Sequence, residues 1–274
     1  MEAILLEPLV QGFMLRALVA GVLVACAGAL LGVFIVLRGL SLVSDGLAHA
    51  AFGGIALGLV MGVTPEAALF VALPFTAAVA VAINLVRQRS AVRGDTATGV
   101  FFSVSFALAV VLISARPASA PPVNLETLLF GSILAVTPAL VIALAIVAAL
   151  VVACVGVLWS RLAYATFDPE LAALSGVPVR ALEHVLLALT AVVVVVGVRT
   201  VGVVLVSACI VVPAATARVI GGSLARMAVL AVVVGVSGTF IGLLGSYHLN
   251  VPSGAAIVLV LGAAFFAALG LGRR

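Results

Sequence analysis

The sequence predicts an all-α fold, a polytopic transmembrane bundle of about eight to nine membrane helices with one short helix outside the membrane. The chain is 66% hydrophobic and only 8% charged. Apolar runs long enough to cross about 30 Å of hydrocarbon follow one another along nearly its whole length. The basic residues, all arginines, gather in alternate gaps between these runs. These observations indicate a single transmembrane domain over residues 1–274, in contact with membrane lipid.

About nine apolar segments meet the length expected of a membrane crossing. They lie near 12–37, 45–63, 66–86, 96–114, 133–158, 185–198, 201–220, 226–244 and 253–271. The start of the chain carries glutamates rather than the positive charges of a secretory signal, so we expect the first segment to be retained. The run 185–198 is short and Arg199 interrupts it. Residues 185–220 therefore form either two helices, or a helix, a re-entrant piece and a second helix, which leaves about eight crossings.

The arginines predict which side of the membrane each gap faces. Short loops that carry arginine stay in the cytoplasm. The gaps assigned to the cytoplasm on this basis contain Arg38, Arg87, Arg89, Arg93, Arg161, Arg180, Arg218, Arg226, Arg273 and Arg274. Arg16, Arg116 and Arg199 fall elsewhere. With nine crossings, the N-terminus lies outside, the C-terminus lies in the cytoplasm, and the proline-rich loop 115–126 is external.

Several functional classes are disfavoured by composition. The chain has no lysine, which a Walker A loop needs to reach the β- and γ-phosphates, so any ATP must be bound by another subunit. It has no GxSxG or HExxH motif, and an enzyme is the least favoured class. No basic patch interleaved with aromatic residues suggests a nucleic-acid partner. The three cysteines are far apart in apolar runs, which favours helix packing over a disulfide or metal site.

The stretch SDGLAHAAFGG at 44–54 places two ionisable residues in an apolar segment. Asp45 and His49 are four positions apart and so share one helix face, with Ser41 one turn earlier if the helix extends that far. A carboxylate and an imidazole suit Mn²⁺, Zn²⁺ or Fe²⁺, and a second copy around a two-fold axis would double the ligand set. Alternatively, Asp45 complements a helix N-terminus. The glycines that follow favour close helix packing.

The stretch YATFDPELAALSGVPVR at 164–180 predicts a short helix in a cytoplasmic gap. Asp168 is a favourable N-cap with Pro169 at the first helical position, and Glu170 complements the helix dipole. Gly176 and the proline that follows it end the helix. The helix is either an interfacial connector that lies flat in the headgroups or a docking element for a cytoplasmic partner.

These residues together resemble the membrane permeases of the bacterial zinc/manganese/iron ABC importers. The resemblance rests on LRGLSLVSDGLAHAAFGGIALG (37–58), LLFGSILAV (128–136), FDPELAALSGVPVR (167–180), RTVGVVLVSACIVVPAATARVI (199–220) and, more loosely, SYHLNVPSGAAIVL (246–259). It covers nearly the whole chain and keeps the order of the blocks.

The resemblance implies a homodimeric permease in the bacterial plasma membrane, bound by a cytoplasmic ABC ATPase and supplied by an extracytoplasmic metal-binding protein. It implies that Asp45 and His49 contact the metal ion in transit, with no permanently bound cofactor. The family's ATPase-coupling loop falls within about 160–184. The coupling residues it implies are Asp168, Glu170, Ala173 and Gly176.

The chain departs from the family's pattern in its last loop, where Asn250 stands at a position expected to hold aspartate. His248 could serve as an entry ligand instead, or it could simply be solvated. Arg199 and Glu126 are candidate gate or docking residues, although Arg199 could equally extend to the interface. Pro213 predicts a kink, with Ser207 close enough to bond the freed backbone groups.

Two other functions remain compatible with the residues. An ATP-independent secondary metal transporter or channel would use the same acidic and histidine pair without a docking helix. A non-transporting membrane scaffold would tolerate replacement of both residues.

Overall fold

The computed structural model describes residues 12–89, 94–117, 129, 131 and 133–271, and these residues contain helices but no strand. The predicted all-α class is therefore confirmed. Glu126 lies outside the described residues, as do the side chains of Arg89, Arg93, Arg273 and Arg274.

Nine of the described helices are long and apolar enough to cross a membrane. They are α2 (Gly12–Leu37), α3 (Ser41–Val60), α4 (Ala68–Arg89), α5 (Gly94–Ser114), α7 (Pro138–Phe167), α9 (Val179–Val201), α10 (Val203–Ile220), α11 (Leu224–Leu249) and α12 (Ser253–Leu271). The re-entrant alternative fails because α9 is one continuous helix of 23 residues, in which Arg199 occupies only the last turn.

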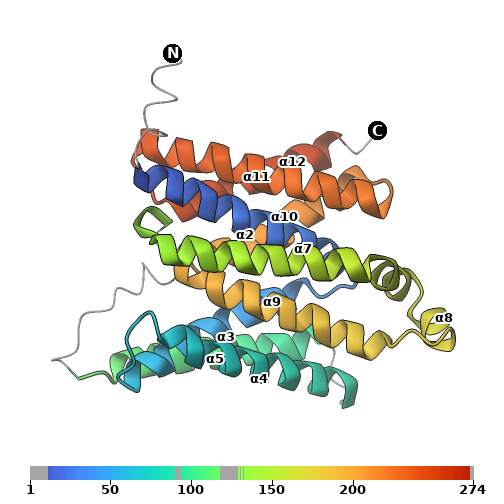
Figure 1. The fold of residues 1–274 in the computed structure, drawn as a ribbon, viewed down its shortest axis with the longest axis horizontal. Coiled ribbons are helices and arrows are strands. Elements are labelled where there is room, and N and C mark those ends of the chain that lie inside the picture. The colour runs from blue at the N-terminus through green and yellow to red at the C-terminus, as the bar shows by residue number, and fades with distance from the viewer. Residues whose placement is uncertain (1–11, 90–93, 118–128, 130, 132, 272–274) are drawn as a thin grey trace.

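The helices form two groups joined by α9 (Figure 1). In the first group, α2 packs against α7, α10 and α11, and α12 packs against α10 and α11. In the second group, α3 packs against α4 and α5. Because α9 contacts α2 and α7 as well as α3 and α4, and α10 also touches α3, the second group is held against the first through α9 and α10.

A short helix, α8 (Pro169–Leu174), projects at one end of the bundle, which we call the α8 end (Figure 1). Contacts place the end of α2, the end of α4 and the start of α9 at this same end, because Arg38 reaches Thr166 and Arg87 reaches Glu183. Arg16 instead bonds the backbone just before α7, at the opposite end. Arg38 and Arg87, which the sequence assigns to cytoplasmic gaps, therefore lie at the α8 end, and Arg16, which it does not, lies at the opposite end.

The turn between α9 and α10 is a single residue, Gly202. Its φ of +86° lies in the left-handed region, which residues other than glycine rarely adopt. Gly131 approaches the same turn so closely that an added Cβ would overlap the Val201 backbone. Two glycines thus allow the backbone of the segment before α7 to lie directly against the α9–α10 turn.

Large apolar side chains remain exposed on the outer helices, as expected of surfaces that face lipid. Examples on α7 are Ile142, Ile146, Val152 and Val157.

Candidate functional site

The site begins with the start of α3. The helix starts at Ser41, four residues before Asp45, and the Ser44 hydroxyl donates to the Ser41 carbonyl at 2.7 Å. Asp45 therefore lies in the second turn, and the first turn holds no acidic residue. The interpretation of Asp45 as a residue that complements the helix N-terminus is weakened, because the favourable dipole interaction is confined to the first turn.

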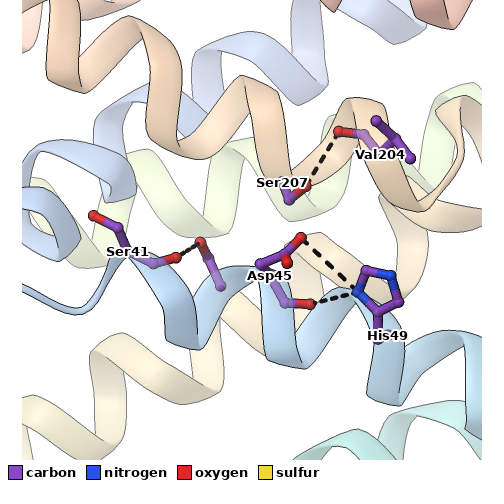
Figure 2. A network of polar contacts seen from close by, with 6 residues as sticks. Ser41, Asp45, His49, Val204 and Ser207 are labelled. Carbon is purple, nitrogen blue, oxygen red and sulfur yellow. Dashed lines mark hydrogen bonds and ion pairs between the residues drawn. The ribbon is translucent and has the colours of Figure 1, made fainter. Parts of the chain in front are cut away.

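His49 lies one turn beyond Asp45, on the same face of α3 (Figure 2). Its Nδ1 atom is 3.0 Å from the Asp45 carbonyl oxygen. A carbonyl oxygen only accepts, so Nδ1 carries the proton and Nε2 of the neutral ring keeps its lone pair. The ring also packs against Phe102 and Phe106 of α5, with centroids 4.1 Å and 5.6 Å away. These contacts fix both the tautomer and the plane of the imidazole.

The Asp45 carboxylate is less enclosed than the imidazole, with 39% of its side chain exposed against 12% for His49. Its Oδ1 is 3.8 Å from His49 Nδ1. That separation is slightly greater than the roughly 3.0–3.5 Å between neighbouring ligand atoms of one ion at bond lengths of about 2.1 Å. Within the described residues, no arginine side chain forms an ion pair with this carboxylate.

Asp45 stands between two hollows. One, of about 300 Å³, lies between α3 and α10, and Figure 2 shows Ser207 of α10 above Asp45. The other, of about 190 Å³, lies between α3 and α5 and is lined by Thr98 and Phe102 as well as Asp45. The carboxylate can therefore be reached from the α10 side and from the α5 side of the helix.

The described part of a single copy brings together too few ligand side chains for a complete metal site. In the described part of the chain, no group of three or more His, Cys, Asp or Glu side chains is placed to hold an ion. Asp45 and His49 offer two ligands, and the remaining positions of a transition metal ion would have to come from water, backbone oxygens or another chain.

The glycines after His49 hold α3 close to its neighbours, as the sequence predicted. A Cβ on Gly54 would lie 2.7 Å from the Ala72 Cα, and one on Gly58 would lie 3.1 Å from the Ala68 Cα. On the other face, a Cβ on Gly53 would lie 3.2 Å from the Ser105 carbonyl oxygen of α5. Close packing on α4 and α5 thus leaves α3 little freedom to shift alone.

The short helix predicted at 164–180 is confirmed as α8. The Asp168 carboxylate accepts from the Leu171 N–H at 2.9 Å, Pro169 occupies the first helical position, and Gly176 has a φ of +81°. Glu170 and Ala173 are exposed. The large apolar side chains nearby are exposed as well, which suits contact with another surface: Phe167, Leu171 and Leu174.

The structure does not bring His248 or Asn250 to Asp45 and His49. His248 lies in the last turn of α11, not in a loop, and it is exposed. Asn250 caps that helix with φ +56°, a left-handed conformation that asparagine tolerates better than most residues. This backbone position gives a physical reason for asparagine there that is independent of any metal.

Arg199, another candidate gate residue, lies against Glu66 of the α3–α4 loop, with Nη2 and Oε1 3.5 Å apart. The sequence analysis did not identify Glu66, because this residue follows a proline in a turn that matches no motif; its side chain is 80% exposed. Ser207 does not bond the carbonyl that Pro213 frees, because its hydroxyl donates to Val204, one turn earlier. Phe102 was also missed, since nothing in the sequence separates it from the other phenylalanines.

Comparison with known proteins gives consistent matches over nearly the whole chain. The sequence profile of the family described as "ABC 3 transport family" matches residues 11–272. A manganese transport system membrane protein of Listeria innocua is 39% identical over 96% of this chain and 92% of its own length. A relative from Haemophilus influenzae, named as a probable iron transport system membrane protein, is 31% identical over 97% and 96%.

A solved structure, PsaBC from Streptococcus pneumoniae in complex with Fab, has a chain that superposes with a TM-score of 0.86 at 31% identity. The match covers 98% of this chain and 95% of that one.

Proposed function

Because this chain belongs to the ABC 3 transport family, we propose that it is the membrane permease of an importer for divalent transition metal ions. Relatives named for manganese and for iron support these two metals as the cargo. Zinc, which the sequence pattern also allows, stays a prediction. The permease is not itself an enzyme, and ATP hydrolysis takes place in a separate subunit.

The observation that carries the proposal is the arrangement of Asp45 and His49 on α3. A carboxylate supplies negative charge to a divalent cation, and an imidazole selects transition metals over Mg²⁺ and Ca²⁺, which prefer all-oxygen shells. The bond between His49 Nδ1 and the Asp45 carbonyl leaves Nε2 as the ligand atom. Release of that bond would instead let Nδ1 and the nearby carboxylate share one ion.

A homodimer would complete the site. An ionisable side chain exposed to hydrocarbon costs about 2.5–3.5 kcal/mol on insertion scales. Asp45 is 39% exposed in one copy, in the hollow between α3 and α10. If a second copy packs over this face around a two-fold axis, the exposed carboxylates are covered and the path gains two carboxylates and two imidazoles.

The ends of the bundle supply the partner surfaces. The arginine-rich α8 end lies in the cytoplasm by the positive-inside rule, which places the C-terminus on that side. A cytoplasmic ABC ATPase docks on α8, whose exposed leucines and capped first turn form a raised, ordered element. An extracytoplasmic metal-binding protein delivers the ion at the opposite end.

The test is uptake of radioactive manganese into proteoliposomes that contain the chain with its candidate ATPase and binding protein. We expect uptake to require ATP and all three components. Asp45→Ala and His49→Ala should each abolish uptake while the complex still assembles. Matched controls are Asp95→Ala, a carboxylate in the first turn of α5, and His248→Ala. ATP-independent uptake would instead support a secondary transporter or channel, and uptake that survives both substitutions would refute the assigned path.

A further inference from the structure

Polar contacts at the α8 end connect the docking helix to the helices that carry the metal site. We use the term α3–α4 hairpin for residues 41–89, which comprise the metal-binding helix and the helix packed against it. Side chains just before the start of this hairpin and near its end bond to the two segments that flank α8. The contacts on one flank come from Arg38 and those on the other from Arg87 and Asn84.

Arg38 lies three residues before the first residue of α3 and bonds to the last turns of α7. Its Nε donates to the Thr166 hydroxyl at 2.9 Å, and its Nη2 donates to the Leu162 carbonyl at 3.4 Å. The Thr166 hydroxyl in turn donates to Leu162 at 2.6 Å, so its lone pair is directed to the guanidinium. Thr166 is two residues before Asp168, the cap of α8. Only the end of α7 thus separates Arg38 from the docking helix.

The second flank is bonded to the end of α4. Arg87 Nη1 lies 3.1 Å from Glu183 Oε1, and both side chains are largely covered, with 23% and 22% exposed. One turn earlier, the Asn84 amide lies 3.1 Å from His184 Nε2. His184 Nδ1 donates to the Arg180 carbonyl at 2.6 Å, so Nε2 is the acceptor for Asn84. These contacts join the first turns of α9, the helix that follows α8, to α4.

Glu183 links the two flanks electrostatically. Partial burial lowers the pKa of Arg38, and the negative charge of Glu183 acts in the opposite direction and raises it. Arginine nevertheless keeps its charge at neutral pH. One carboxylate at the start of α9 therefore attracts the arginines at both ends of the α3–α4 hairpin.

The hairpin itself is suited to move as one body. The Gly54 and Gly58 contacts bring α3 onto the backbone of α4, and closely packed helices shift together rather than deform. Asp45 is four residues along α3 from Ser41, a rise of about 6 Å. Arg38 is thus joined to the metal-binding carboxylate by residues 39 and 40 and the first turn of α3.

We propose that Arg38 is a positioning residue for transport, which transmits displacement of α8 through the end of α7 to the α3–α4 hairpin and so to Asp45 and His49. The inference rests on the proposed function, since it assigns the route by which nucleotide-driven movement at α8 changes the metal path. The pair of Arg87 and Glu183 supports the same movement from the other flank.

The experiment measures manganese ions imported per ATP hydrolysed in proteoliposomes of the complete complex. In Arg38→Ala we expect this ratio to fall at least about fivefold, the lower limit of ordinary coupling between sites. ATP hydrolysis by the assembled complex should stay within about twofold, because Arg38 contacts neither nucleotide nor α8. Arg38→Lys keeps the charge without the planar fork and should restore the ratio only in part.

Thr166→Val gives a second, nearly isosteric test, which removes the acceptor of the Arg38 Nε bond together with the bond that the Thr166 hydroxyl donates to its own helix at Leu162. It should lower the same ratio, and the double variant with Arg38→Ala should be no worse than Arg38→Ala alone, because both changes break one interaction. The matched control is Arg161→Ala, an exposed arginine near the end of α7 for which the described residues show no side-chain partner. That variant should keep the wild-type ratio.

An unchanged ratio in Arg38→Ala and Thr166→Val would overturn the inference, and so would a parallel loss of hydrolysis and uptake, which would indicate a role in assembly. If Arg38→Ala does not assemble, the ratio measured for Thr166→Val decides. Wild-type complex that shows no ATP-dependent uptake would contradict the proposed function itself. Normal wild-type uptake with unaltered variants would contradict only the assignment of Arg38.

Discussion

The N-cap of α8 allows docking of the ATPase to be tested by a substitution of known cost. The helix has six residues, too few to be stable by propensity alone, and its first turn depends on the 2.9 Å bond from the Leu171 N–H to the Asp168 carboxylate. Replacement of an aspartate N-cap by alanine costs about 1 kcal/mol. If docking requires the folded helix, Asp168→Ala should raise the dissociation constant for the ATPase by up to about fivefold, the limit that this cost allows.

The assay is an equilibrium titration of labelled ATPase against the purified permease in detergent. Asp168→Asn keeps a capping oxygen without the charge and should stay within about twofold of wild type, because asparagine and aspartate are similar N-caps. Asp95→Ala, which removes an acidic residue from the first turn of α5, is the matched control. An asparagine variant as weak as the alanine variant would refute the capping argument, because the charge itself would then contact the partner. An unchanged dissociation constant in both variants would show that docking does not depend on the capped turn of α8.

Four further outcomes follow from backbone geometry and exposure. Gly54→Ala places a methyl 2.7 Å from the Ala72 Cα and should destabilise the protein by about 1–3 kcal/mol, seen as a lower Tm in detergent. Gly156→Ala on α7, with no atom near the new Cβ, should leave Tm unchanged or raise it. Gly202→Ala forces a residue with a Cβ to a φ of +86°, which costs roughly 1–2 kcal/mol of stability and should lower Tm or yield. A wild-type Tm would show that the turn relaxes. His248→Ala should leave manganese uptake unchanged, and a loss would restore His248 as an entry ligand.

Hydropathy predicted most of the fold, because the length of an apolar run is set by the membrane. It placed the nine spans but not their polar ends. Hydropathy placed the second apolar segment near 45–63 and left open whether the helix extends back to Ser41, where α3 in fact begins. It ended the fifth span near 158, but α7 continues past Arg161 to Phe167.

In the candidate site, features set by residues close together in the sequence were predicted, and contacts between residues far apart in the sequence were not. The shared face of Asp45 and His49 and the capped helix at Asp168 follow from spacing over a few residues, and both were predicted. The contact of Arg38 with Thr166 joins residues 128 positions apart. Such contacts depend on which helices are neighbours, and neither hydropathy nor arginine counts determine this from one sequence.

The most direct test of the central claim is the stoichiometry of manganese bound to the purified permease, measured by equilibrium dialysis with radioactive manganese alongside the mass of the assembly. A shared site formed by Asp45 and His49 from two copies predicts one ion per two chains, lost in both Asp45→Ala and His49→Ala. One ion per chain, or binding that survives either substitution, would contradict the account.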